Sequence, residues 1–277
     1  MKAFLKAFPL LAVVAMGSVA LAEDTYTIRR TLTEGEKTKY TIQSVMDGKL
    51  DLSAFGQGSM DLSVKSGMTL LMIIDKVKDG KAMFTGKVTD HTLEMEPAPP
   101  GETVPKEFSV KGSLTDRNDV SDVKFEGLTG MSKMMTEGSM QGILRALILP
   151  EKPVKIGETW EQPKTVKLGS GSIDSDVKAT LLAVEKKDDK EFFKISLKGK
   201  AKTIGEVGAE EGGGMGMGKM KSTSDSTIDA IVMLDKATGK LISMTNSGDI
   251  SVSTEMVDMG MTIPMSGKMT MKVEIAK

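Results

Sequence analysis

The side chains with the clearest capacity for chemistry are thioethers. The chain contains 23 methionines and no cysteine among its 277 residues. Thioether sulfur is a ligand that Cu(I) prefers, and Met215, Met217 and Met220 are closely spaced in a glycine-rich stretch where no packing pattern requires them. These three residues are the candidate ligands of a Met-based copper-binding protein. The other interpretation is that methionine serves as an adaptable core residue, because most of the other methionines follow strand or helix periodicity.

Acid–base chemistry has fewer candidates. The single histidine, His91, has no nucleophile motif to act with, and we interpret it as an ordinary surface residue. Two carboxylates at a suitable separation are enough for a glycosidase-type reaction, and acidic pairs occur at Asp174/Asp176, Asp188/Asp189 and Glu210/Glu211. Most of these acids fall at expected turns, where solvation explains them. We therefore expect no enzyme and no catalytic residue, and a carboxylate-dependent hydrolase stays open as an alternative.

The composition excludes several other classes of site. Without cysteine there is no disulfide, no thiolate zinc site and no iron–sulfur cluster. One histidine excludes a multi-histidine metal site. Without Lys2 and Lys6, which belong to a predicted leader, the chain has 35 basic and 38 acidic residues and a net charge of −3. This balance of interspersed charges is not typical of nucleic-acid binding, and we expect no cofactor.

Residues 1–22 have the pattern of a secretory signal peptide. Lys2 and Lys6 flank the start of an apolar stretch that extends over 7–16, and Ala20-Leu21-Ala22 forms a small-x-small cleavage site. No cysteine follows to carry a lipid, so we expect the mature protein to be secreted or periplasmic. Later segments are all shorter than the roughly 18 consecutive apolar residues of a membrane helix, so we expect no integral membrane segment after cleavage.

Most of the mature chain alternates apolar and polar residues, as half-buried antiparallel strands do. The stretches 228–234 and 269–275 are clear examples, and 68–74 is apolar on both faces, which predicts a central strand. Turns are expected where polar or glycine-containing pairs interrupt the alternation: Asp47-Gly48, Ser66-Gly67, Asp79-Gly80, Asn118-Asp119, Asp188-Asp189, Thr238-Gly239 and Asn246-Ser247-Gly248.

One segment has helical rather than strand periodicity. Met140, Ile143, Leu144 and Leu147 are spaced at i, i+3, i+4 and i+7, which predicts a short helix near 131–148. The expected fold is all-β and mainly antiparallel, with two similar curved β-sheet halves or an open half-barrel and this one helix. The expected parts are an N-terminal β half (23–127), a helical connector (128–149) and a C-terminal β half (150–277) with a disordered Gly/Met-rich loop at 205–221. The two halves show a weak internal repeat.

The most distinctive string is Leu149-Pro150-Glu151-Lys152-Pro153-Val154-Lys155-Ile156-Gly157-Glu158-Thr159-Trp160. Physically it reads as a helix stop, a short extended segment, a glycine turn and a large aromatic residue at the start of a strand. It resembles the L-P-x-x-P-V-x-x-G-x-x-W segment of uncharacterised secreted bacterial β-rich proteins that form a domain-of-unknown-function family. The resemblance covers about 12 residues and brings no catalytic residue with it. It implies an exported bacterial protein.

The function that these features favour is a non-enzymatic binding or structural module of the cell envelope. A methionine-rich helix beside a curved sheet can form an apolar groove, since methionine adapts to varied shapes. A lipid or another hydrophobic small molecule is therefore the expected ligand, and protein partners stay unknown. The residues expected to line or edge its site are Met131, Met134, Met135, Leu144, Leu147 and Trp160.

Overall fold

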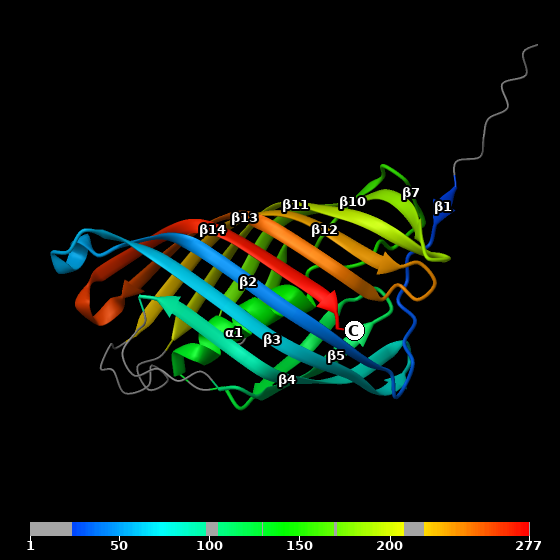
Figure 1. Ribbon diagram of the computed structural model, residues 1–277, viewed down its shortest axis with the longest axis horizontal. Helices are drawn as coiled ribbons and strands as arrows, with labels where there is room; N and C mark the ends of the chain where they lie inside the picture. The colour runs from blue at the N-terminus through cyan, green and yellow to red at the C-terminus, as the bar shows by residue number, and fades with distance from the viewer. Residues whose placement is uncertain (1–23, 98–104, 129, 169–170, 208–218, 277) are drawn as a thin grey trace, which may run out of the picture.

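The protein consists of one large curved antiparallel sheet with a helix on its inner side (Figure 1). This description rests on a computed structural model, which describes residues 24–97, 105–128, 130–168, 171–207 and 219–276. The prediction of an all-β, mainly antiparallel fold with one short helix is confirmed. The predicted signal peptide lies outside the described residues.

The sheet contains twelve strands in the order β6-β5-β4-β3-β2-β14-β13-β12-β11-β10-β8, and β9 also pairs with β10. A separate two-stranded sheet joins β1 to β7. The elements are β1 Thr25–Tyr26, β2 Lys37–Asp51, η1 Ser53–Phe55, β3 Ser59–Lys78, β4 Lys81–Glu96, β5 Phe108–Thr115, β6 Val120–Glu126, α1 Gly130–Leu144, β7 Val154–Lys155, β8 Thr159–Glu161, β9 Thr165–Leu168, β10 Gly171–Lys187, β11 Lys190–Val207, β12 Met220–Asp235, β13 Leu241–Met256, η2 Val257–Met259 and β14 Met261–Ile275.

The two parts of the chain on either side of α1 lie side by side in this one sheet. Strands β2 to β6 form a meander, and β10 to β14 form a second meander that runs across the sheet in the same direction. The pairing of β14 with β2 joins them, so the last strand of the chain lies beside the first long one. A structural core therefore extends across the junction, from Ile42 on β2 to Val273 on β14.

The inner face of the sheet, which carries the core, is set by alternation along each strand, interrupted at a few bulges. On β12, for example, Ala230, Val232 and Leu234 are buried on the inner face. Asp229, which directly precedes Ala230, points to the outer face and is exposed. Helix α1 covers part of this face through Met140, which is fully buried, and through Ile143 and Leu144, which pack against the core cluster. The outer face carries the charged residues.

Several glycines that predict turns lie instead inside long strands. Gly48 is in the middle of β2 and pairs directly with Gly267 of β14, and Gly248 is in the middle of β13. A Cβ at Gly48 would lie 2.2 Å from the backbone oxygen of Ser266, and one at Gly267 would lie 2.4 Å from that of Asp47. The expected turns at Asp47-Gly48, Ser66-Gly67 and Asn246-Ser247-Gly248 are therefore wrong, because all three lie inside strands. Gly48 and Gly248 permit close approach of neighbouring strands rather than chain reversal.

The turns at Asp79-Gly80, Asn118-Asp119, Asp188-Asp189 and Thr238-Gly239 do reverse the chain, as expected. At the stretch expected to be a loop (205–221), β11 continues to Val207 and β12 begins at Met220. The residues between them, 208–218, lie outside the described residues.

Candidate functional site

The inner face continues past the core toward the η1 and η2 end of the sheet, and there it is lined by half-buried apolar side chains. We call this surface the methionine face. It extends over five neighbouring strands, β4, β3, β2, β14 and β13. Its members are Met46, Leu50, Met60, Val64, Met95, Ile250, Val252, Ile263, Met265 and Met269.

Strand register brings these residues together from distant parts of the sequence. Met46 of β2 pairs with Met269 of β14 and with Val64 of β3, and Val64 in turn pairs with Met95 of β4. One step further along the strands, Leu50 pairs with Met265. Contiguous apolar surface of this kind marks binding sites more often than isolated exposed residues do.

The methionine face ends at a polar boundary on β12. At the inner-face positions of β12 that continue its rows, the chain carries Ser222, Ser224 and Ser226. The next strand, β11, continues with Ala201 and Thr203. The apolar surface is thus interrupted by serines at these three rows of β12.

A separate small cavity lies beside the C-terminal end of α1, toward the opposite end of the same face. It has a volume of about 70 Å³, and Leu144 and Leu147 of the predicted ligand site line it together with Ile42, Met244 and Val273. Ligand pockets for drug-sized molecules are typically about 300–1,000 Å³, so a whole lipid does not fit here. The side chains of Met131, Met134 and Met135 lie outside the described residues, although their backbone belongs to α1.

A buried arginine, which the sequence analysis did not single out, forms a polar wall of this cavity. Arg30 is only 7% exposed. Its backbone N–H donates to Asp116 O at 2.7 Å, and the N–H of Thr31 donates to Thr238 O at 2.8 Å, so two turns hold the segment in place. Arg30 lies in an irregular segment between β1 and β2, where no periodicity predicts burial.

The carboxylate nearest to Arg30 is shared with other groups. Glu36 Oε1 lies 2.9 Å from Lys240 Nζ and accepts a hydrogen bond from Thr38 Oγ1 at 3.1 Å. Arg30 Nη2 is 3.6 Å from the same oxygen, and Arg30 Nε and Nη2 have no hydrogen-bond partner among the described residues. Burial raises the pKa of the neighbouring Tyr40 hydroxyl, an effect that the positive charge of Arg30 partly offsets.

Trp160 has a structural contact at the crossover after α1. Its Nε1–H donates to Ile148 O at 2.9 Å, and the side chain of Gln162 both donates to Ile148 O and accepts from Ile148 N–H. Trp160 packs against the core cluster from β8, where it pairs with Ala179. It does not line the small cavity. The distinctive string from Leu149 to Trp160 thus ties the end of α1 to the second meander.

Of the predicted copper ligands, Met215 and Met217 lie outside the described residues. Met220 is buried at the start of β12. It pairs with Met256 of β13, which pairs with Met261 of β14, and all three are on the inner face. Sequence spacing could not reveal this row, because its members come from three strands that only the sheet brings together.

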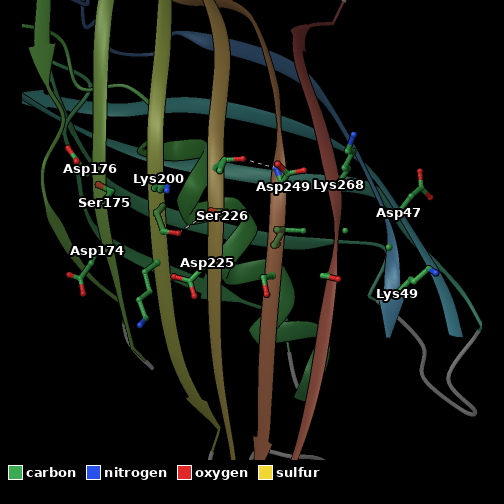
Figure 2. Close-up of a pocket in the computed structure, with 18 of the residues that line it drawn as sticks. Asp47, Lys49, Asp174, Ser175, Asp176, Lys200, Asp225, Ser226, Asp249 and Lys268 are labelled. Carbon is green, nitrogen blue, oxygen red and sulfur yellow. Dashed lines mark hydrogen bonds between the residues drawn. The ribbon is translucent and has the colours of Figure 1, made fainter. Parts of the chain in front are cut away.

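The outer face carries a groove with a volume of about 1020 Å³ (Figure 2). Helix α1 lies behind the strands in this view, on the opposite side of the sheet. The groove crosses β10 to β14 and reaches β2. Five lysines and five aspartates line it: Lys49, Lys164, Lys200, Lys202, Lys268, Asp47, Asp174, Asp176, Asp225 and Asp249.

Opposite charges pair across β2, β14 and β13 and again across β12, β11 and β10, whereas the neighbouring β13 and β12 both carry an aspartate in the groove. Lys268 pairs in register with Asp47 on one side and Asp249 on the other, and Lys202 lies between Asp174 and Asp225. These side chains are exposed. A hydrolase needs a carboxyl group in apolar surroundings that keep it protonated, and exposed aspartates beside lysines do not provide those surroundings. Cross-strand charge pairs of this kind stabilise a sheet modestly.

The interpretation of His91 as a surface residue is wrong. The ring is only 4% exposed, its Nδ1 lies 3.0 Å from Pro105 O, and it makes an edge-to-face contact with Phe108. The cause is a bulge, because the register of β3 and β4 shifts between Gly67 and Thr69 and Asp90 has φ 55°. The extra residue turns His91 toward the inner face.

Comparison with known proteins finds a family match to part of the chain and no activity. Residues 127–241 match a family of unknown function (DUF6263). The matched region contains α1, the strands β7 to β12 and the first residue of β13. A search of curated proteins finds no match to the chain. Among the described residues, no helix is both long enough and apolar enough to span a membrane.

Proposed function

We propose that this protein is an exported, non-enzymatic binding protein of the cell envelope whose ligand has a long apolar chain. The single observation that carries the proposal is the methionine face, an apolar track that is half-buried and bounded by serines. Methionine side chains are flexible and polarizable, and they adapt to acyl chains of varied conformation. The pattern of residues 1–22 supports export.

The sequence analysis predicts an apolar ligand between the sheet and the helix, whereas the proposal places it elsewhere on the inner face. A cavity of about 70 Å³ between sheet and helix holds a small group only. The methionine face extends over five strands, from β4 to β13, so it offers an acyl chain a longer apolar surface than the cavity does. The proposal therefore places the chain of the ligand on the open part of the inner face.

The test is binding of lauryl alcohol, an uncharged single-chain probe, to the delipidated mature protein by isothermal titration. We expect saturable binding that Met269→Lys weakens at least tenfold, because a lysine there charges the methionine face. Met83→Lys is the matched control, since Met83 is 52% exposed on β4 and its neighbours Ala82 and Phe84 are the buried ones. Equal effects of the two substitutions, or no binding to the wild type, would contradict the proposal.

Export has its own test. We expect the protein expressed in a bacterial host to be recovered from the periplasm or medium with an N-terminus at Glu23. Recovery only from the cytoplasm with residues 1–22 intact would contradict export and leave the binding proposal to be judged separately.

A second candidate function is Cu(I) binding through thioethers, which the row of Met220, Met256 and Met261 favours. Neighbouring strands are about 4.8 Å apart, so flexible methionine side chains on three adjacent strands can converge on one ion. We expect a Cu(I) titration to show one site that is lost when these three residues are changed to leucine together. Retention of that site after the triple change would assign it to other residues, and an absence of Cu(I) binding would refute this candidate.

A further inference from the structure

We propose that the inner face binds a single-chain fatty acid, with the carboxylate in the small cavity at Arg30 and the chain along the methionine face. This inference rests on the proposed function. It adds the chemical class of the polar end of the ligand and the residue that recognises it.

The first argument is the unmet hydrogen-bonding capacity of Arg30. Its Nε and Nη2 are buried without a hydrogen-bond partner among the described residues. These two nitrogens form one edge of the guanidinium, and that edge binds the two oxygens of a carboxylate in parallel hydrogen bonds. The ion pair of Arg30 with Glu36 is long, at 3.6 Å, and it leaves the hydrogen-bonding capacity of this buried guanidinium only partly met. Unmet capacity in a buried charged group is costly, so a ligand that supplies two acceptors gains affinity from this site.

The second argument is the local charge. Arg30 and Lys240 lie around one carboxylate, Glu36, and the three groups carry a net charge of +1. Glu36 Oε1 already accepts from Thr38 and pairs with Lys240 at 2.9 Å. Lys240 has the closer contact with Glu36, whereas Arg30 lies 3.6 Å from it, so Arg30 is the cation of this cluster with more hydrogen-bonding capacity left for an anion.

The cavity at Arg30 is small. Its volume of about 70 Å³ suits a compact polar group such as a carboxylate. Asn118 also lines the cavity, and its side-chain Oδ1 is buried without a hydrogen-bond partner among the described residues.

The fourth argument is the path from the cavity to the methionine face. Three residues at the cavity lead along the inner face of their strands to the methionine face: Ile42 through Ser44 to Met46 on β2, Met244 through Asn246 and Gly248 to Ile250 on β13, and Val273 through Met271 to Met269 on β14. From Ile42 to Leu50 the β2 backbone extends roughly 26 Å. This distance suits a long acyl chain.

The experiment compares lauric acid with lauryl alcohol at about pH 8, where the free carboxyl group is ionised. We expect the wild type to bind the acid about tenfold to a hundredfold more tightly than the alcohol, since a charged hydrogen-bonded pair is lost with the alcohol. Arg30→Gln should remove this preference, Arg30→Lys should retain part of it, and Lys111→Gln on the exposed part of β5 should leave it unchanged.

The outcomes separate the two proposals. If neither probe binds the wild type, the proposed function fails. If both probes bind the wild type equally, the cavity holds only water and the inference at Arg30 is refuted, whereas the apolar site stands. The acid-to-alcohol ratio of the wild type decides this even if Arg30→Gln does not fold. A preference for the acid that persists in a folded Arg30→Gln protein would place the carboxylate elsewhere.

Discussion

Replacement of Gly48 by alanine tests the close contact that joins the two meanders. The new Cβ would lie 2.2 Å from Ser266 O and 2.8 Å from Gly267 Cα, whereas ordinary Cβ contacts begin near 3.4 Å. The backbones of β2 and β14 must therefore separate by about 1 Å at this point. Overpacking costs about 1–3 kcal/mol and a weakened ladder hydrogen bond about 1 kcal/mol more. The gain from a less flexible unfolded chain is at most about 1 kcal/mol, so the contact dominates.

We therefore expect Gly48→Ala to lower the free energy of unfolding by about 2–3 kcal/mol. The assay is urea denaturation followed by the fluorescence of Trp160, the single tryptophan. The matched control is Gly138→Ala in α1, where an added Cβ meets no atom within 4 Å and helix propensity should add up to about 1 kcal/mol.

A second glycine makes this prediction sharper. Gly267 faces Gly48 across the same pair of strands, and its added Cβ would lie 2.8 Å from Gly48 Cα. Once one substitution has separated the strands, the other should cost less, so the double variant should lose less stability than the sum of the two single variants. A Gly48→Ala protein as stable as the wild type would refute the reasoning.

Three further predictions concern buried polar groups. Glu36→Gln should lower the free energy of unfolding by about 3 kcal/mol in urea denaturation, because it leaves Arg30 and Lys240 without their carboxylate. Glu126→Gln is the control and should change stability little, since Glu126 and its partner Lys111 are both exposed. Trp160→Phe should cost about 1 kcal/mol by circular dichroism, because Ile148 O keeps Gln162 as a donor; a loss of several kcal/mol would contradict this. Burial raises the pKa of Tyr40, so the folded state holds that proton above about pH 10, where the unfolded chain releases it. Stability should therefore fall as the pH rises from about 9 to 11, and Tyr40→Phe should fall less; equal slopes would refute the assignment.

The fold class follows from local pattern, but strand length does not. Alternation over 228–234 and helical spacing from Met140 to Leu147 predict β12 and α1 correctly, because both signals reflect burial of one face. Gly48 and Gly248 predict turns in isolation. In the structure each is the position where a neighbouring strand comes too close for a side chain, and sequence alone does not identify that neighbour.

The candidate site is less accessible to sequence reasoning than the fold. Period-2 alternation assigns Met46 and Met269 each to an apolar face, but only the pairing of β2 with β14 makes those faces continuous. Arg30 has no local signal, because turns near residues 116 and 238 bury it. The methionines of the helix are close together in the sequence, whereas those of the methionine face are not. Sequence reasoning therefore favours a ligand site at Met131, Met134 and Met135.

Methionine methyl NMR tests the central claim most directly, because the proposed site is lined by methionine. The mature protein is labelled at its methionine methyl groups and titrated with lauric acid. We predict that the resonances of Met46 and Met269 shift together and saturate, and that the resonance of Met83 on the outer side of β4 stays in place. Unchanged inner-face resonances at saturating lauric acid, or an equal shift of Met83, would contradict binding on the methionine face.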